Sequence, residues 1–519
     1  MSGAASSEDV RSLGRWEEAV QATGFGAYRQ VVVLMGRMEV EHLDVLVVGA
    51  GLSGVGAGCH LETRCPGKSY AILEARDSIG GTWDLFRYPG VRSDSDMYTL
   101  GYAFRPWSEA KAIADGPSIL SYVKETAAHY GVDRKIRTGH RVVRAEWSTE
   151  EARWTVDVER TGGETVRITC GFLFMCTGYY RYDQGYTPEF PGVERFGGRV
   201  VHPQFWPDDV DYAGKRVVVI GSGATAVTLV PAMAETAEHV TMLQRSPSYV
   251  LSLPAEDPIA NFVRRVLPAR AAYWIVRWKN VLVTMLVFQL SRRRPRVMKA
   301  LIRKGLENRL PPGFDIDTHF KPRYNPWDQR MCLVPDGDLF EAICDGSASI
   351  VTDGIETFTE GGLRLASGAE LEADLVITAT GLNLLPLGGA ALSVDGRAVE
   401  IPKTMGYKGM MLSGVPNMAV AIGYTNASWT LKCDLTCEYV CRLLNHMDEG
   451  GYRQATPLNR DPSVAEEPFI DFTSGYVLRS IDKFPKQGSK APWRLYQNYA
   501  RDIVALRYGA LDDGALVFA

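Results

Sequence analysis

The stretch Asp44–Gly54, DVLVVGAGLSG, sets the fold of this 519-residue chain. A run of aliphatic residues at 44–48 predicts a buried strand that ends directly in a loop of the form GxGxxG. A helix is expected from 53 to 63, and a second strand from 69 to 73 ends at Glu74. This order of strand, glycine loop, helix and strand is typical of a dinucleotide-binding α/β unit.

Each glycine of the first loop is needed at its position for a physical reason. Gly49 makes the tight turn, Gly51 lets the backbone approach a pyrophosphate, and Gly54 lets the helix pack closely on the strand. The helix N-terminus around Ser53 offers unpaired N–H groups to the phosphates. Glu74, twenty residues after Gly54, is placed to accept hydrogen bonds from ribose hydroxyls. The loop therefore predicts a cofactor with free ribose hydroxyls.

The same pattern restarts later in the chain. An apolar strand is predicted at 216–220, followed by the loop GSGATA at 221–226, a helix and a strand at 240–244. Arg245 follows this strand at the position where the first unit has Glu74. A guanidinium at this position suits the 2′-phosphate of NADPH. The alternative is that Arg245 is an ordinary surface arginine. The cofactor contacts expected in this unit are Gly221, Gly223, Ala224, Thr225 and Arg245.

Two such units in one chain predict two cofactors, FAD at the loop with the acid and NADPH at the loop with the arginine. Each unit is closed by an apolar strand, at 172–176 and at 375–378, that is followed by Thr-Gly or Ala-Thr-Gly. The expected fold is therefore α/β, with two Rossmann-like domains, the second inserted into the first. The expected bounds are a flexible N-terminal extension at 1–40, the first part of the FAD-binding domain at 41–195, the NADPH-binding domain at 196–370 with a helical insertion at 255–325, and the second part of the FAD-binding domain at 371–519.

Composition excludes several other classes of protein. Lys+Arg 57 against Asp+Glu 61 gives a net charge of −4, so no nucleic-acid partner is expected. Nine cysteines, an odd number without a dense framework, fit free thiols in a reducing cytoplasm. Cys433, Cys437 and Cys441 share one face of a helix predicted at 431–446, where a buried apolar stripe is expected rather than a metal site.

One segment has an unusual charge pattern. Residues 258–306 contain twelve Lys and Arg and no acidic residue, and within them 281–290 is nearly all apolar, yet too short to span a bilayer. One interpretation is a helical lid over the substrate site, and another is a peripheral contact with anionic lipid headgroups. We favour both together, which would place the protein in the cytoplasm and peripherally on the inner face of the cell membrane.

Two longer motifs carry a resemblance to a known family. Residues 196–207, FGGRVVHPQFWP, match FxGxxxHxxxW, and 80–94, GGTWDLFRYPGVRSD, match [AG]GxWx4[FY]P[GM]x3D. With both glycine loops in order, the chain resembles the FAD-containing Baeyer–Villiger monooxygenases. The stretches 83–90 and 424–429 are similar in particular to the ethionamide-activating branch of that family.

The resemblance implies a reaction. NADPH would reduce FAD, and reduced flavin with O2 would form a C4a-peroxyflavin. This species would insert one oxygen into a ketone, giving an ester or lactone, or would oxygenate the sulfur of thioethers or thioamides. The implied partners are a small lipophilic ketone or sulfur substrate and O2.

The resemblance also implies roles for single residues. Arg330 would supply positive charge beside the reacting oxygen, and Asp94 would orient it; the alternatives are an ordinary ion-pair arginine and a turn-capping aspartate. His202 lies in the linker motif, and a role in domain positioning is preferred to direct proton transfer. Trp429 either starts a helix that faces the flavin or is a core anchor. Further cofactor contacts are expected at Gly81, Thr82, Trp83, Asp94 and Tyr98.

Two other functions fit a two-cofactor chain less well. A flavin-dependent NADPH oxidase or disulfide reductase is disfavoured because the sequence has no redox CxxC pair and carries the linker motif. A membrane-associated binding protein with a vestigial nucleotide fold is disfavoured because both glycine loops are intact.

Overall fold

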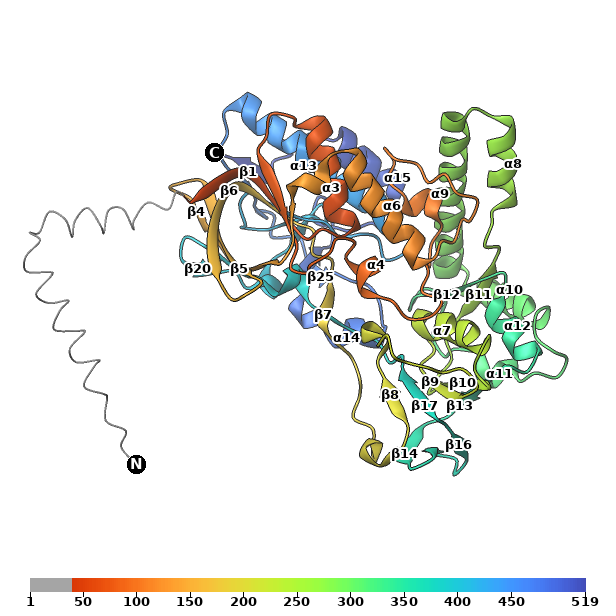
Figure 1. The fold of residues 1–519 in the computed structure, drawn as a ribbon. Coiled ribbons are helices and arrows are strands. Elements are labelled where there is room, and N and C mark those ends of the chain that lie inside the picture. Colours follow the sequence, from red (N-terminus) through yellow and green to blue (C-terminus); the bar gives the residue numbers. More distant parts are fainter. Residues whose placement is uncertain (1–39) are drawn as a thin grey trace, which may run out of the picture.

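The computed structural model describes residues 40–519, so the extension expected at 1–40 lies, apart from Val40, outside the described residues. Two α/β domains lie beside each other (Figure 1), and the chain runs from the first into the second and back. Red, orange and blue segments gather in the first domain, while green and teal segments form the second. The expected nesting of one domain within the other is confirmed by the two sheets.

The first domain is built on a mixed sheet whose centre is parallel. Strand β1 (Glu41–Val48) lies between β2 (Tyr70–Leu73) and β6 (Thr165–Met175). The full order is β20 (Arg397–Ala398), β19 (Ala391–Val394), β4 (His140–Ser148), β5 (Arg153–Arg160), β6, β1, β2 and β3 (Ile136–Arg137), with β23 (Met418–Val420) also paired to β6. The strand expected at 172–176 is confirmed as the last part of β6, where residues 172–175 pair in parallel with β1. The earlier part of the same strand pairs antiparallel with β5.

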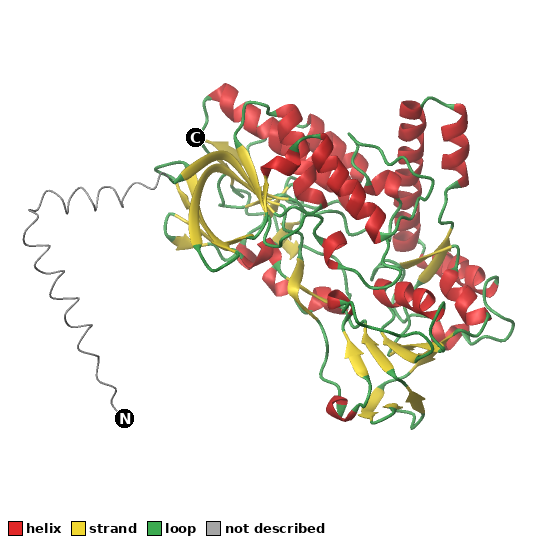
Figure 2. Ribbon diagram, viewed as in Figure 1, coloured by secondary structure: helices red, strands yellow, loops and turns green. Residues whose placement is uncertain are grey.

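Successive side chains of β1 point to opposite faces of the sheet and contribute to two hydrophobic cores. Val45 and Val47 pack into the cluster that contains helix α3 (Leu52–Arg64), whereas Leu46 and Val48 join the opposite cluster. The first cluster also holds α6 (Gly116–His129) and α13 (Trp429–Gly450), which lie beside α3 on one side of the sheet (Figure 2). The predicted cysteine stripe of α13 is confirmed, since all three of its cysteines are buried.

The second domain contains a parallel sheet of five strands. Its order is β13 (Ala348–Thr352), β10 (His239–Gln244), β9 (Arg216–Ile220), β17 (Leu375–Thr378) and β8 (Arg199–Val201). Helix α7 (Ala224–Ala234) follows the second glycine loop, as expected. The domain boundary expected at 371 is wrong, because β17 pairs with β8 and β9 and therefore belongs to the second sheet. The chain returns to the first domain only beyond Gly381.

The remaining elements of the second domain are short strands and helices. After β13 the chain forms an antiparallel set of three short strands, β14 (Ile355–Thr359), β15 (Gly362–Leu365) and β16 (Glu370–Glu372). The helical insertion consists of α8 (Pro258–Val266), α9 (Ala269–Arg293), α10 (Pro295–Glu307) and α11 (Ile316–His319). Within residues 40–519, no helix combines the length and apolarity that crossing a bilayer requires.

The close fit of α3 on the first glycine loop gives a stability prediction. A Cβ at Gly54 would stand 1.8 Å from the Gly49 carbonyl oxygen, so Gly54→Ala must push the helix away from the sheet. We expect a loss of about 3 kcal/mol in the free energy of unfolding, measured by urea denaturation. The matched control is Gly67→Ala, where a Cβ would meet nothing within 4 Å. Equal stability of the two variants would contradict the prediction.

Candidate active site

A cavity of about 1110 Å³ lies between the two domains and reaches both glycine loops. It is lined by residues of both domains, including the ends of β1, β2, β9 and β10. This is the position at which open α/β sheets bind ligands, outside the carboxyl ends of their parallel strands. The expected site residues that line it are Gly49, Gly51, Ser53, Glu74, Gly81, Thr82, Trp83, Asp94, Gly221, Gly223, Ala224, Thr225, Arg245, Arg330 and Trp429.

The first loop leaves space and donors for a pyrophosphate. Helix α3 begins at Leu52 with Gly51 as its N-cap, and no side chain caps its first N–H groups. Glu74 is buried at the end of β2, and its Oε2 accepts a hydrogen bond of 2.8 Å from Ala50 N while Oε1 accepts one of 3.0 Å from Arg76 N. A buried carboxylate fixed by two backbone donors and facing the cavity fits the ribose of a dinucleotide.

The GG-x-W motif lies directly across the first loop. A Cβ on Gly81 would come within 2.9 Å of Gly51 Cα, so these two glycines allow the two backbones to approach each other. Gly81 caps the short helix α4 (Thr82–Leu85), and Thr82 Oγ1 lies 3.1 Å from Tyr182 Oη. The chain after this motif continues into a second short helix, α5 (Met97–Leu100).

Trp429 links two helices at the wall of the cavity. It is the first residue of α13, and its indole Nε1 donates a hydrogen bond of 2.8 Å to Ser53 Oγ at the start of α3. Its ring also lies 5.1 Å from that of Tyr179 and lines the cavity. The tryptophan therefore ties the N-termini of two helices together at the wall of the cavity.

The second loop offers a more open cradle. Gly221 has φ +143°, and a Cβ there would stand 2.3 Å from the Ala379 carbonyl oxygen. A Cβ on Gly223 would meet nothing within 4 Å, so the space in front of α7 is free for a phosphate. Arg245 directly follows β10, is exposed, and has no ion pair among residues 40–519. An unpaired guanidinium beside this cradle fits a further phosphate.

Arg330 and Asp94 meet at the cavity although 236 positions separate them in the chain. Arg330 Nε lies 2.8 Å from Asp94 Oδ2. Arg330 precedes β12 (Cys332–Pro335), which pairs with β11 (Val250–Leu253) of the second domain, whereas Asp94 comes from the first domain. Burial opposes the charge of Arg330, but Asp94 and three neighbouring tyrosines outweigh it and raise the pKa of the guanidinium. The site therefore holds a permanent positive charge.

Sequence reasoning missed the tyrosines around this pair. Tyr179 and Tyr180 follow the turn after β6, and Tyr476 lies in α14 (Gly475–Leu478) near the C-terminus. Burial is the main cause that raises the pKa of each of the three phenols, so they are neutral donors. The first two directly follow Thr177-Gly178, which could have singled them out, but the sequence around Tyr476 gives no such signal.

Arg479, an arginine that the sequence analysis did not single out, also lines the cavity. The guanidinium carbon of Arg479 lies 3.4 Å from the centre of the Tyr186 ring. Burial lowers the pKa of Arg479, and no carboxylate pairs with it among the described residues. Its Nη2 lies 3.4 Å from the Leu382 carbonyl oxygen, where the chain returns from the second domain.

Three expected site residues do not line the cavity. Gly54 packs α3 against Gly49, a structural role that supports the loop. Tyr98 is wrong as a cofactor contact: it is buried in α5, and its Oη lies 3.5 Å from Arg264 Nη1. His202 does not line the cavity, and its ring packs on Gly185.

The surroundings of His202 agree with the preferred role in domain positioning. Its Nδ1 accepts a hydrogen bond of 3.2 Å from Gln204 N, and its Nε2 lies 3.3 Å from the carbonyl oxygen of Gly381. This arrangement requires the neutral ring with its proton on Nε2. The imidazole thus joins the FxGxxxHxxxW segment to the point at which the chain leaves β17.

Two dinucleotide-type loops that share one cavity with an ion-paired arginine define a two-cofactor oxidoreductase. Comparison with known proteins refines this class. The family model described as NAD(P)-binding Rossmann-like domain matches residues 47–112, and the model described as flavin-binding monooxygenase-like matches 112–384.

Sequence relatives cover almost the whole chain. The FAD-containing monooxygenase EthA of Mycobacterium tuberculosis is 60% identical over 480 residues, which are 92% of this chain and 98% of that protein. EthA of Mycolicibacterium smegmatis is 55% identical over 479 residues, with 92% and 97% covered. The chain therefore belongs to the flavin-binding monooxygenase family.

Solved structures agree on the fold. An oxidized steroid monooxygenase bound to NADP has a TM-score of 0.68 at 24% identity and covers 80% of this chain and 87% of its own. A complex of OTEMO with FAD and NADP has a TM-score of 0.72 at 21% identity, with 93% and 100% covered. The expected fold of two Rossmann-like domains is confirmed.

The half-buried imidazole of His202 predicts a pH dependence of stability. Burial lowers the pKa of His202 below its ordinary value of 6.5, so the unfolded chain takes up a proton at a higher pH than the folded chain. The free energy of unfolding must then fall as the pH drops through 6.5, by at most about 1.4 kcal/mol per pH unit for one group. In His202→Gln this contribution is absent, and urea denaturation between pH 7 and 5 should show a shallower decline. A decline as steep as that of the wild type would contradict the assignment.

Proposed function

We propose that this protein uses NADPH and O2 to oxygenate small lipophilic ketones or sulfur compounds, with FAD at the first glycine loop and NADPH at the second. The observation that carries the proposal is the Arg330–Asp94 pair, held at 2.8 Å in the cavity that both loops share. When bound and reduced, FAD supplies the oxygen activation. The residues of the chain itself would position the substrate, supply positive charge and exclude water.

Arg330 supplies the charge that this chemistry needs. Negative charge develops on the reacting oxygens when oxygen adds to a carbonyl, and a guanidinium stabilises it without giving up a proton. The raised pKa of Arg330 keeps that charge at every working pH. Asp94 fixes the direction of the guanidinium through Nε and leaves the two terminal nitrogens free to donate.

The region next to Arg330 suits an apolar substrate. A small pocket shares Tyr179, Tyr424 and Tyr476 with the main cavity. Beyond these three tyrosines one part of its wall is apolar, and another part holds the ion pair of Lys432 with Asp502. The apolar part is formed by Ile422, Phe469, Ile470, Phe472, Val477 and Leu495. Apolar walls bury a lipophilic molecule, while the tyrosines and the arginine can orient one carbonyl or sulfur group.

Membership in the family supports this proposal over the two alternatives. An NADPH oxidase would release the activated oxygen as hydrogen peroxide, and a disulfide reductase would need a redox pair of cysteines. All nine cysteines of the chain are free thiols in the structure. A binding protein with a vestigial fold would not need a buried acid and open cradles at the two loops.

Replacing Arg330 tests the proposal directly. Arg330→Met keeps much of the side-chain volume and removes the charge, so formation of ester or sulfoxide should fall about 100-fold or more while NADPH oxidation continues with release of hydrogen peroxide. The measurement is mass spectrometry of products from a ketone and thioether panel under 18O-labelled O2. Undiminished product, or product without label, would refute the proposal, and an unchanged FAD content serves as the folding control.

Replacing Arg245 tests the nicotinamide assignment. If the guanidinium binds the 2′-phosphate, Arg245→Ala should raise the KM for NADPH about tenfold or more and leave the KM for NADH nearly unchanged. The same preference should appear in equilibrium binding of NADP+ and NAD+. A matched control is Arg199→Ala, an exposed arginine that does not line the cavity. Equal changes for both cofactors would remove the assignment.

A further inference from the structure

The insertion presents an exposed apolar face that the proposed reaction does not use. Twenty large apolar side chains are exposed in the described part of the chain, and nine of them lie within residues 259–286, on α8, α9 and the turn between them. The nine are Ile259, Phe262, Val266, Leu267, Trp274, Ile275, Leu282, Val283 and Leu286. Such a concentration on one hairpin marks an interaction surface.

The spacing of these residues places them on one side of each helix. On α8 they recur at intervals of three and four residues. On α9 the five exposed residues follow one another at intervals of one, seven, one and three, which also keeps them within one half of the helix circumference. The opposite side of α9 is buried and carries Ala272, Val276 and Val281. The hairpin therefore has two apolar faces: the inner face is packed against the protein, and the outer face is exposed.

The inner face of the hairpin is firmly anchored on the first domain. Arg277 is 1% exposed, and its Nη1 donates hydrogen bonds of 2.7 Å and 3.0 Å to the carbonyl oxygens of Tyr98 and Gly101. Asn280 Nδ2 donates to Asp96 Oδ1 at 2.9 Å. The outer face is thus held in place by specific contacts, so its exposure does not come from loose packing.

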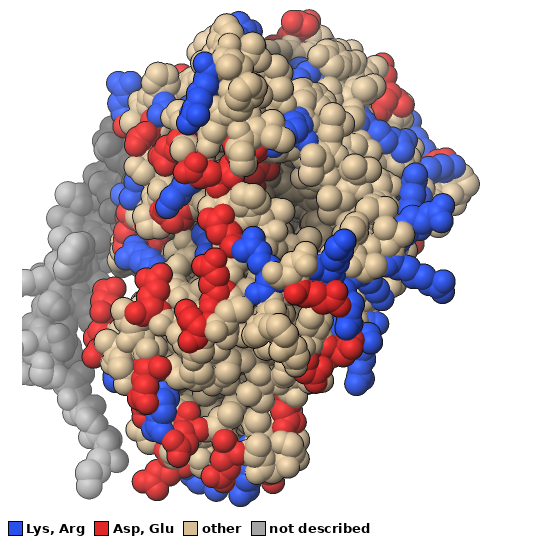
Figure 3. Space-filling model, turned by 90° about the vertical axis from the view of Figure 1, so that its right-hand side faces the viewer, with Lys and Arg blue, Asp and Glu red and all other residues tan. Residues whose placement is uncertain are grey.

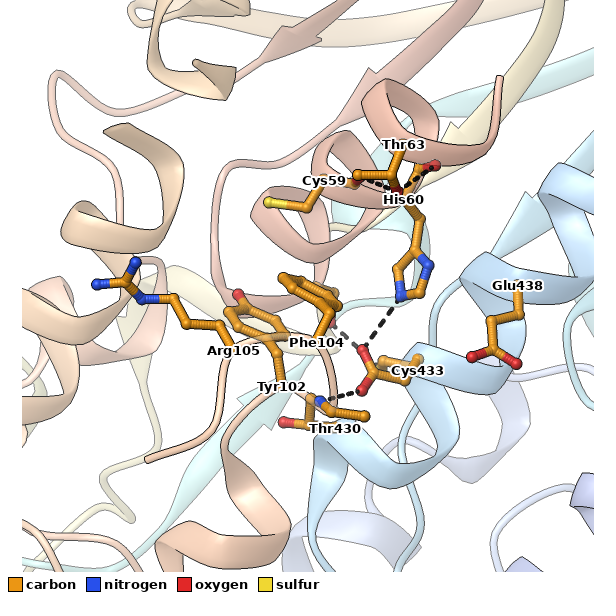
Figure 4. A network of polar contacts seen from close by, with 12 residues as sticks. Cys59, His60, Thr63, Tyr102, Phe104, Arg105, Thr430, Cys433 and Glu438 are labelled. Atoms are coloured by element: carbon orange, nitrogen blue, oxygen red, sulfur yellow. Dashed lines mark hydrogen bonds and ion pairs between the residues drawn. The ribbon is translucent and has the colours of Figure 1, made fainter. Parts of the chain in front are cut away.

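A buried polar network continues this anchor into the domain. Asp434 of α13 accepts a hydrogen bond of 3.0 Å from Ala103 N, and its Oδ2 lies 4.0 Å from Arg277 Nη2. Figure 4 shows His60 pointing from α3 toward α13, and its Nε2 lies 3.4 Å from Asp434 Oδ1. The hairpin therefore rests on the same helices that form the first glycine-loop site.

The hairpin itself carries charges of one sign, and its nearest acidic neighbours in the sequence are Glu256 and Asp257 at the start of α8, where Asp257 pairs with Lys279. Residues 258–306 contain no acidic side chain, and Arg265, Arg270, Arg293 and Arg294 have no ion pair within residues 40–519. Arg265 and Arg270 flank the turn of the hairpin, and the other two lie where α9 ends. Figure 3, which faces the side of the molecule where the hairpin lies, shows a wide uncharged area around a hollow, with Lys and Arg side chains along its right-hand edge.

We propose that the α8–α9 hairpin docks this protein peripherally on an anionic lipid bilayer. Its apolar outer side chains would enter the boundary between headgroups and acyl chains, and its arginines would pair with lipid phosphates. A second copy of the chain is a poorer occupant, because a symmetric pair would bring the same unpaired arginines together. The proposal does not depend on the reaction proposed above.

Vesicle co-sedimentation of the FAD-loaded full chain tests the proposal. The wild type should sediment with vesicles rich in phosphatidylglycerol, much less with pure phosphatidylcholine, and less again at about 0.5 M NaCl. The triple variant Phe262→Gln/Val266→Gln/Leu286→Gln and the double variant Arg265→Gln/Arg270→Gln should each lower the partition coefficient about tenfold or more. All five side chains are exposed, so these changes should leave the fold and the FAD content intact.

The matched control is Val504→Gln, since Val504 and Phe262 are both 64% exposed and Val504 lies outside the hairpin. This variant should bind vesicles like the wild type. Quenching of tryptophan fluorescence by brominated lipid should also decrease in Trp274→Phe. Failure of the wild type to bind anionic vesicles at low salt, or equal binding by all variants, would overturn the proposal. So would a triple variant that only converts a dimer into monomers in size-exclusion chromatography, because the occupant would then be a second copy.

Discussion

The close approach of helix α3 to the loop before it is the constraint on which the rest of the site depends. No side chain larger than hydrogen fits at Gly54, and that contact brings the start of α3 up to the end of β1. The unpaired N–H groups of the helix then face the cavity with Glu74 beside them. Trp429 joins α13 to the same point through Ser53, so one backbone contact organises two helix termini.

The second domain has the same order of strand, glycine loop and helix, and it also supplies two arginines to the cavity. Its sheet places a more open cradle opposite the first loop and carries Arg245 and Arg330 to the shared cavity. The half-buried guanidinium of Arg330 keeps its charge there because Asp94 and neighbouring tyrosines offset the partial loss of hydration. Since Asp94 belongs to the first domain, the paired arginine exists only when both domains are in place.

The insertion contributes no residue to the lining of this cavity, and its outer side forms part of the molecular surface. Its inner face uses Arg277 and Asn280 to hold the first domain, and its outer face is left apolar with unpaired arginines at both ends. An enzyme that accepts lipophilic substrates would gain from such a surface, because these substrates concentrate in membranes.

The sequence by itself determined the two glycine loops, their strands and helices, Glu74, Arg245 and the nesting of the domains, because turn geometry and hydrophobic periodicity are local properties of the chain. Only the packing of distant segments placed β17 in the second sheet, left His202 outside the cavity lining and brought Tyr476 near Arg330. The same packing put Arg479 in the wall of the cavity. The physical reason is that these outcomes depend on which distant segments pack together, and no local pattern encodes the distance between side chains that lie more than a hundred residues apart.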